Sequence, residues 1–212
     1  MSDITIVTAF FDIGRGNLPA MVRGRILPHY QHRSVETYFE FFRNLAKIKN
    51  DMVIYTTKEH AERIRNIRIE EGFGEKTNVI VLPTYLPENM KDVKGKVQQI
   101  MDDEVFWKSV DNPHLIEYWH SDYVLINIFK SLYVTHAINT GIVKTDLAAW
   151  IDFGYVRSQE TLPSNLEWKY DFDPDKMHMF KMREIDPDRP ISDIIKTGDV
   201  YTQGCHIVAV IS

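Results

Sequence analysis

The sequence predicts an α/β protein in which a mostly parallel sheet carries helices on both faces and is followed by a mixed or antiparallel part. Two observations support this fold class. Short apolar segments alternate with longer segments of helical periodicity as far as Leu82, and such alternation favours parallel strands joined by crossover helices. The strand segments are continuously apolar, which is typical of strands that are covered on both faces.

The strands of the parallel part are expected at residues 4–11, 52–55, 78–82 and 147–153. Each is rich in Val, Ile, Phe or Tyr and is followed by turn residues. After residue 155 the pattern changes, because residues 177–182 and 200–211 resemble strands with no helix of useful length between them. We therefore expect the C-terminal part to be mixed or antiparallel.

Four helices are expected between these strands. The first begins at the N-cap Ser34, and the second follows a capping-box pattern of Thr56 and Glu59 and ends at Gly72. A third helix is expected within residues 96–109. A long apolar helix, capped by Ser121, is expected to run to Gly141.

Length and composition limit the class of protein. The chain has 212 residues, a net charge of −5 and a pI near 5.9, and this acidic balance argues against a general nucleic-acid binder. Cys205 is the single cysteine, so no internal disulfide can form. No signal peptide and no apolar run of about 20 residues is present. We expect one domain over residues 1–212 in the cytoplasm, without a transmembrane segment, and leave open peripheral contact with the cytoplasmic face of the inner membrane.

The loop after the first strand is the first candidate binding segment. It follows Thr8, Ala9 and Phe10 and contains Asp12, Gly14, Arg15 and Gly16. Glycines let a backbone approach a phosphate closely, and an arginine can donate two hydrogen bonds to it. Pro19 stands where the dinucleotide fingerprint has its third glycine, so that fingerprint is excluded. A simple turn with an exposed arginine is the alternative.

The second candidate segment is the end of the strand that carries Asp152. A carboxylate that ends an apolar strand is costly unless it has a partner or a function. It could hold a divalent cation and, through it, a diphosphate; a turn-capping aspartate before Gly154 is the alternative. Because parallel strands send their carboxyl ends to one edge of the sheet, we expect Asp152 and the Asp12–Gly16 loop to share one cleft, with Arg15 exposed in it.

Other polar clusters have two interpretations each. A basic run precedes the first helix and could neutralise a phosphate or an anionic acceptor, or be a solvated surface: Arg23, Arg25, His29, His32 and Arg33. A second cluster lies where the long helix starts and could be an anion site or part of the core: Tyr118, Trp119, His120, Asp122 and Lys130. We expect a salt-bridged surface at Arg63, Arg65 and Arg68. The histidines lack the spacing of a zinc site: His114, His120, His136, His178 and His206.

Four segments together resemble the HtrL/YibB-like family of bacterial proteins, whose members accompany cell-surface polysaccharide and lipopolysaccharide synthesis. They are TAFFDIGRG at 8–16, FRNLA at 42–46, MVIYT at 52–56 and AWIDFGY at 149–155. The family looks like part of the GT-A glycosyltransferase group, so the resemblance implies a GT-A-like, Rossmann-like domain. It also implies that this chain, which ends soon after its last apolar strand, lacks a full C-terminal acceptor region.

The resemblance implies a function as well: a nucleotide-sugar-dependent glycosyltransferase that uses a saccharide or lipid-linked acceptor. Arg15 would contact phosphate, and Asp152 would bind Mn²⁺ or Mg²⁺ or the donor sugar. The nucleotide-sugar site would also include Thr8, Ala9, Phe10, Asp12, Gly14, Gly16 and Tyr155. GT-A enzymes usually carry two carboxylates where this chain has Asp152 alone. A catalytically silent nucleotide-sugar or saccharide binding protein of the same fold is therefore the alternative.

Overall fold

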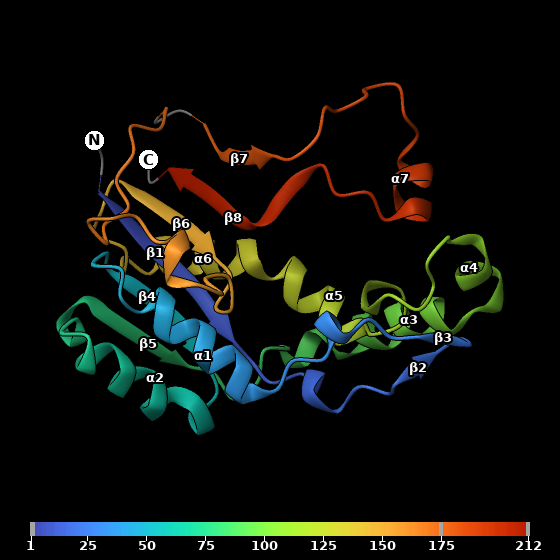
Figure 1. Cartoon of the computed structure of the whole chain (residues 1–212), viewed down its shortest axis with the longest axis horizontal. Helices are drawn as coiled ribbons and strands as arrows, with labels where there is room; N and C mark the ends of the chain where they lie inside the picture. The colour runs from blue at the N-terminus through green and yellow to red at the C-terminus, as the bar shows by residue number, and fades with distance from the viewer. Residues whose placement is uncertain (1–2, 174–175, 211–212) are drawn as a thin grey trace.

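The protein is described here by a computed structural model that covers residues 3–173 and 176–210, and it contains a six-stranded sheet with helices on both faces (Figure 1). The strand order is β5-β4-β1-β6-β8-β7. The strands are β1 Ile4–Phe10, β4 Met52–Thr56, β5 Thr77–Val81, β6 Leu147–Ile151, β7 His178–Lys181 and β8 Thr202–Val210. The predicted α/β fold, with a parallel part and a mixed C-terminal part, is confirmed.

The four strands β5, β4, β1 and β6 are parallel, and β8 and β7 are antiparallel to their neighbours. In register, Ile6 of β1 lies opposite Met52 of β4 and Ala149 of β6. The carboxyl ends of β1, β4 and β6 therefore lie at one edge of the sheet. Loops that follow β1 and β6 meet at that edge.

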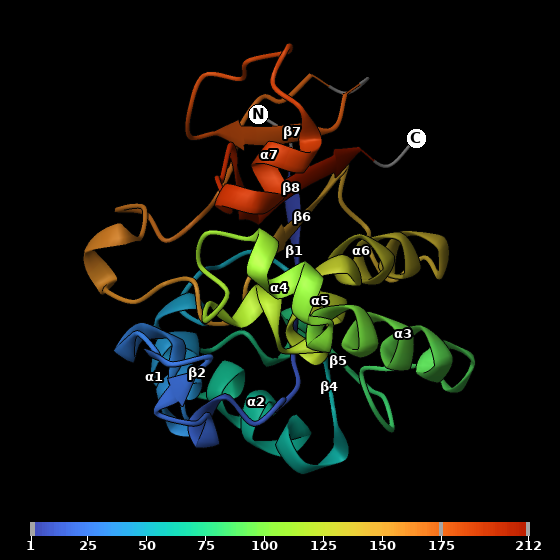
Figure 2. The same cartoon turned by 90° about the vertical axis from the view of Figure 1, so that its right-hand side faces the viewer.

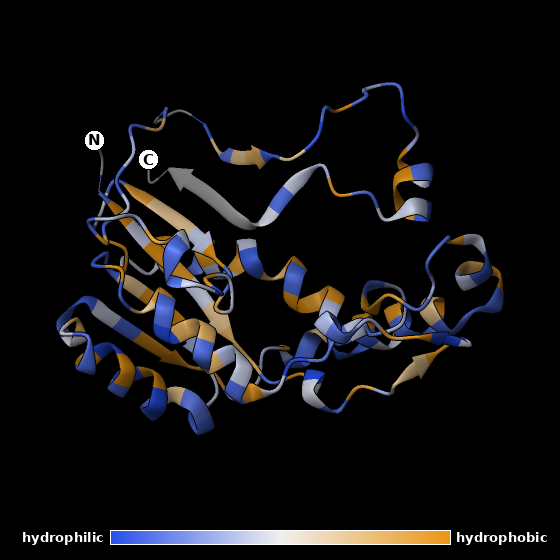
Figure 3. Cartoon of the chain, viewed as in Figure 1, coloured by the Kyte–Doolittle hydropathy of each residue, from blue (hydrophilic) through white to orange (hydrophobic). Residues whose placement is uncertain are grey.

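Two layers of helices cover the two faces of the parallel strands. One layer is α1 Val35–Leu45 and α2 Lys58–Glu70, and the other is α5 Ser121–Ile128 and α6 Lys130–Asn139. The other helices are α3 Lys91–Asp102, α4 Glu104–Ser109 and α7 Ile191–Thr197. Side chains alternate along β1, so Ile6 and Phe10 pack with α1 and α2, whereas Val7 and Phe11 pack with α5 and α6. Figure 3 shows the resulting apolar strands and the mixed polar and apolar surface of α2.

Short elements connect these layers. A two-stranded sheet is formed by β2 Met21–Val22 and β3 Arg25–Ile26. The 3-10 helices are η1 Arg15–Asn17, η2 His29–Gln31, η3 Gly74–Lys76, η4 Glu88–Met90, η5 Ile116–Tyr118 and η6 Gln159–Thr161.

The ends of the first two helices follow the sequence prediction except at Thr56. The Ser34 side chain accepts a hydrogen bond from the Thr37 amide, and Gly72 follows α2 with a φ of +83°. The Thr56 hydroxyl instead donates to the Phe10 carbonyl at 2.8 Å, and α2 begins two residues later at Lys58. The predicted capping box is therefore wrong, because Thr56 is the buried last residue of β4.

Two predicted helices are each divided in two. The segment expected at 96–109 is α3 and α4, because Asp103 leaves the helical conformation and caps α4 by accepting from the Val105 amide. The long helix divides at Phe129 into α5 and α6. Ser121 is not its cap, because it is a buried first residue whose amide donates to Gln98.

The antiparallel strands β7 and β8 are joined through the seven-residue helix α7, although no helix of useful length was expected there. Figure 2 shows β7, β8 and α7 as a layer above α4 and α5. Ile211 and the side chains of Cys205 and His206 lie outside the described residues.

The charged face of α2 is only partly the salt-bridged surface that the sequence predicts. Arg63 forms an ion pair of 2.6 Å with Glu36 of α1. Arg68 is 0% exposed, and its guanidinium donates to the carbonyls of Ala46, Ile48 and Asn50 and to the Thr77 hydroxyl. The prediction is wrong for Arg68, because its partners lie on the connections around β4 and β5.

No helix in residues 3–173 and 176–210 is long and apolar enough to cross a bilayer.

Candidate functional site

A cavity of about 680 Å³ lies at the edge of the sheet where β1 and β6 end. Its walls include the end of β1 and the following loop, from Ala9 to Ile13, and the segment from Asp152 to Tyr155 after β6. Other walls come from η1, η2, α1, η5, α5, the start of α6, η6 and the start of β8. The prediction that Asp152 shares one cleft with the loop after the first strand is thus confirmed, because both follow parallel strands of one sheet.

Arg15 lies in the wall of this cavity and is 7% exposed. Its Nε and Nη2 donate to the Gln31 carbonyl at 3.1 and 2.9 Å, and its Nη1 donates to the Tyr38 hydroxyl at 2.7 Å. The guanidinium also lies over the ring of Tyr123, 5.2 Å from its centroid. The prediction of an exposed Arg15 is wrong, because these partners on η2, α1 and α5 enclose the side chain.

Arginines concentrate positive charge on the same side of the cavity. Arg33 and Arg157 line it with Arg15. Burial lowers the pKa of Arg33, and repulsion from Arg15 and Arg157 lowers it further, while Tyr38 opposes the change. Within the described residues, these three guanidinium groups form no salt bridge with a carboxylate. An anion bound between them would therefore relieve repulsion as well as gain charge-assisted hydrogen bonds.

Asp152 lines the cavity and is paired with a lysine. Its Oδ1 lies 2.7 Å from Nζ of Lys130, at the start of α6, and accepts from Nε1 of Trp150 at 2.6 Å. The Lys130 side chain is 13% exposed and also donates to the Gly204 carbonyl at 3.1 Å. The Asp152 side chain is 37% exposed. Lys130 therefore holds Asp152 in place and balances its charge.

These residues do not fit a protein-built metal centre. Metal-binding sites in proteins commonly use several oxygen, nitrogen or sulfur ligands, or one or two carboxylates with substrate phosphates. Across residues 3–173 and 176–210, no three His, Cys, Asp or Glu side chains are grouped as metal ligands. At Asp152, the ammonium of Lys130 takes the position beside Oδ1 that a cation would need. The positive charge of the cavity comes from its own side chains.

Gly154 brings the loop after β6 against α1. A Cβ atom at this position would lie 2.8 Å from Cδ1 of Tyr38, which is closer than ordinary contacts. Only glycine lets the two segments approach so closely. The next residue, Tyr155, accepts a hydrogen bond from the Gln203 side chain at 3.0 Å, and this connects the loop to the start of β8.

Comparison with known proteins places the chain in a family. The family described as "Bacterial protein of unknown function (HtrL_YibB)" matches residues 2–210. The chain belongs to the HtrL/YibB family. It is 35% identical over 212 residues to "Protein HtrL" of Escherichia coli (strain K12). The matched region covers 98% of this chain and 71% of that protein. No solved structure matches the chain.

Within this HtrL/YibB chain, three residues of the predicted nucleotide-sugar site are not among those that line the cavity: Thr8, Gly14 and Gly16. Thr8 is fully buried in β1, and its hydroxyl makes no hydrogen bond within the described residues. Gly14 has a φ of +79° and its amide donates to Oδ1 of Asp12, so it shapes the turn that precedes Arg15. The other predicted residues do line the cavity: Ala9, Phe10, Asp12, Arg15, Asp152 and Tyr155.

Sequence reasoning missed several cavity residues of this family member: Gln31, Tyr38, Glu117, Tyr123, Arg157 and Gln203. Tyr38 and Tyr123 lie on helices at positions that helical periodicity assigns to the core. Periodicity indicates which face of a helix is buried but not which neighbour it contacts. Burial raises the pKa of the Tyr123 hydroxyl, while Arg15 opposes the change. The tyrosine therefore stays neutral beside the guanidinium.

The two polar clusters divide between site and scaffold. From the basic run, Arg33 lines the cavity, whereas Arg23 donates to the carbonyls of Pro113 and Tyr118 and so fixes the segment before α5. From the cluster at the start of the long helix, Lys130 lines the cavity. Asp122 is instead paired with Lys94 at 2.6 Å.

Proposed function

We propose that this protein is a nucleotide-sugar-dependent glycosyltransferase whose donor binds in the cavity at the carboxyl ends of β1 and β6. The observation that supports the proposal best is that Arg15, Arg33 and Arg157 line this cavity together and that, among the described residues, none of their guanidinium groups has a carboxylate partner. Such a group favours a ligand with more than one negative charge. In an open α/β sheet this edge is the usual place for a nucleotide.

The proposed chemistry is sugar transfer with a nucleoside diphosphate as leaving group. The bond between the sugar C1 and the diphosphate oxygen breaks, and a bond from C1 to the acceptor oxygen forms. Negative charge grows on the leaving diphosphate, so fixed positive groups stabilise the transition state more than the bound substrate. Arg15, Arg33 and Arg157 supply that charge in the proposed site.

The carboxylates of the cavity have separate proposed roles. Both contacts of Asp152 involve Oδ1, and we assign Oδ2 to a hydroxyl of the donor sugar. Asp12 and Glu117 also line the cavity, and either carboxylate could accept the proton that the acceptor hydroxyl loses. The family resemblance extends the proposal to a saccharide or lipid-linked acceptor in cell-surface polysaccharide or lipopolysaccharide synthesis.

A catalytically silent binding protein is the second candidate function. It is favoured by the state of Asp152, whose charge is balanced by Lys130 and which, in the described part of the chain, belongs to no group of three possible metal ligands. The two candidates share the same ligand and differ only in turnover.

A thermal-shift screen followed by a donor-hydrolysis assay tests both candidates. A nucleoside diphosphate present at 100 times its Kd stabilises the folded state by about 2.7 kcal/mol, which raises the Tm by about 5–11 °C for a chain of this size. Release of nucleoside diphosphate from a nucleotide sugar, measured with and without Mn²⁺, supports the transferase. Binding without release supports the silent protein. No shift with any nucleoside diphosphate or nucleotide sugar would contradict both.

A further inference from the structure

A second cavity of about 690 Å³ lies on the same face of the sheet as α1 and α2, but beyond the part of that face that these two helices cover. Three of the residues that line it, Trp168, Phe172 and Phe180, pack on the buried cluster of Ile4, Leu147 and Ala149 of β1 and β6. Four aromatic side chains line it, from the segment before β7 and from β7 itself: Trp168, Tyr170, Phe172 and Phe180. No described residue of α1 or α2 lines this cavity, and Tyr170 is 58% exposed.

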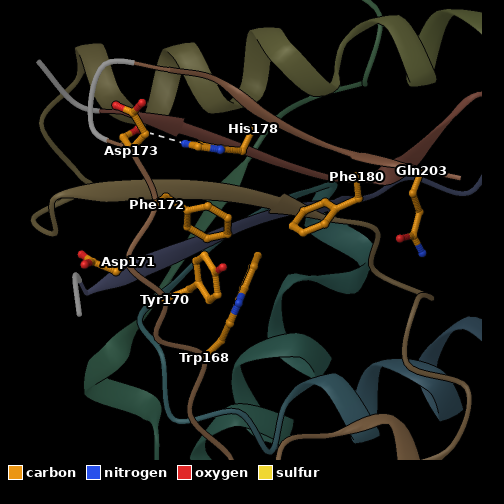
Figure 4. Close-up of a pocket in the computed structure, with 8 residues that line it drawn as sticks. All are labelled: Trp168, Tyr170, Asp171, Phe172, Asp173, His178, Phe180 and Gln203. Carbon is orange, nitrogen blue, oxygen red and sulfur yellow. Dashed lines mark hydrogen bonds between the residues drawn. The ribbon is translucent and has the colours of Figure 1, made fainter. Parts of the chain in front are cut away.

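The rings are arranged around this cavity rather than stacked on one another (Figure 4). Tyr170 and Phe172 are 4.6 Å apart between centroids at an interplanar angle of 50°, whereas Phe172 and Phe180 are 6.3 Å apart at 81°. Trp168 and Phe172 are also edge-to-face, at 6.3 Å and 87°. Ring faces carry negative partial charge, and C–H groups of a pyranose carry positive partial charge, so such faces suit a sugar ring.

The tryptophan of this cavity is held in place by a buried side chain. The Asn50 amide accepts from the Trp168 backbone amide at 2.8 Å and donates to the Trp168 carbonyl at 2.8 Å. Next to it, the Lys49 amide donates to the Leu166 carbonyl at 2.7 Å. The backbone at Trp168 is therefore fixed before any ligand arrives, which lowers the entropy cost of binding at this residue.

Polar groups lie at both ends of the aromatic surface. Asp171, Asp173 and His178 lie at one end and Gln203 at the other (Figure 4). Carboxylates accept hydrogen bonds from hydroxyl groups, and a side-chain amide can both accept from them and donate to them. Two carboxylates at one end disfavour a phosphate or a nucleic acid. A saccharide combines the apolar ring faces and the many hydroxyl groups that this lining suits.

Gln203 also connects the two cavities. It lines both, and its side chain donates to the Tyr155 hydroxyl, which belongs to the first cavity. A linear ligand on the aromatic surface would therefore point its end past Gln203 toward Asp152.

We propose that the second cavity binds a saccharide chain through Trp168, Tyr170 and Phe172, and that this saccharide is the acceptor whose end enters the first cavity past Gln203. The acceptor role rests on the proposed transferase function. Saccharide binding itself does not depend on it.

The test is saccharide binding by the purified chain, measured on an array of hexose, heptose and N-acetylhexosamine oligosaccharides and then by titration of the bound compound. Tyr170 is 58% exposed, so Tyr170→Ala should fold normally. Loss of its ring contact should raise the Kd about 2- to 13-fold. Tyr170→Phe keeps the ring and should stay within about twofold of the wild type, since ring stacking is the interaction at issue. Ile100→Ala on α3, at a residue 57% exposed and remote from the cavity, should have no effect.

Several outcomes would overturn the proposal. The first is that the wild type binds no saccharide, and the second is that Tyr170→Ala binds the saccharide as tightly as the wild type does. The third is self-association of the wild type that Tyr170→Ala abolishes, which would assign this surface to a second copy of the chain. A nucleoside diphosphate titration of Tyr170→Ala separates this proposal from the previous one. Unchanged nucleotide affinity together with weakened saccharide binding would support separate sites for the two ligands. Competition between the two ligands would contradict separate sites. Saccharide binding without any nucleotide binding would refute the acceptor role and the transferase but keep the saccharide site.

Discussion

Replacing Arg15 with methionine should reduce both stability and anion affinity, because the guanidinium serves the fold and the cavity at once. The variant loses the bonds that Arg15 donates to the Gln31 carbonyl and to the Tyr38 hydroxyl. A buried carbonyl left without a donor costs about 1–3 kcal/mol. Methionine fills similar volume and removes a buried charge, which offsets part of that cost. We expect a net loss of about 2 kcal/mol, or about 4–8 °C in Tm.

The affinity of Arg15→Met for a nucleoside diphosphate should fall more clearly than its stability. A hydrogen bond to a charged group contributes about 1.5–3 kcal/mol, so the Kd should rise about 10- to 150-fold if Arg15 contacts a phosphate. Calorimetry on the folded variant at a temperature well below its Tm measures this change. Arg25→Met is the matched control, because Arg25 is exposed, donates to the Asp111 carbonyl at 3.2 Å and does not line the cavity.

Unchanged affinity in folded Arg15→Met would remove Arg15 from the ligand site and leave it a structural residue. An unchanged Tm would show that the Gln31 carbonyl finds another donor, and the burial argument would then be wrong. An equal loss in Arg25→Met would show that the effect is the general loss of positive charge.

Three further variants test other parts of the structure. Asp152→Asn should fold normally and should lose turnover by a factor of at least about 100, in the range of a lost transition-state contact. Its affinity for a nucleoside diphosphate, measured by calorimetry, should not fall, because the change frees Lys130 from its carboxylate. A large fall in that affinity would indicate a bound metal. Thr8→Val should keep the nucleotide affinity of the wild type. It should raise the free energy of unfolding, measured by denaturant titration, by up to about 1–3 kcal/mol, because the buried hydroxyl has no hydrogen-bond partner among the described residues. A loss of stability would show that the hydroxyl does have a partner. Arg68→Met should lower the free energy of unfolding by about 3–5 kcal/mol, because several buried carbonyls lose their donor, and a change below about 1 kcal/mol would contradict that account.

The strands were predictable because their signal is local. Continuous apolar segments bounded by turn residues identify β1, β4, β5 and β6 to within two residues, and strand direction then places Asp12 and Asp152 at one edge. The shared cleft therefore follows from the sequence and from the geometry of parallel sheets.

Side-chain environments were less predictable because they depend on partners distant in the chain. Arg15 lies between two glycines in a loop, a context that favours exposure, yet Gln31 and Tyr38 enclose it from η2 and α1. Arg68 resembles its charged neighbours in sequence, but its acceptors are backbone carbonyls that no side-chain pattern identifies. The breaks at Asp103 and Phe129 were missed because periodicity continues across them.

The contacts of Asn50 have a consequence for the order in which the chain folds. Its side chain bonds the Ile4 carbonyl near the N-terminus and both backbone groups of Trp168, 118 positions away. Closing so long a loop costs more entropy than pairing β1 with β4, whose contacts are closer in sequence. The segment around Trp168 should therefore dock onto a parallel sheet that is already formed. It should also be among the first parts to detach, because opening it leaves the pairing of β1, β4 and β5 intact.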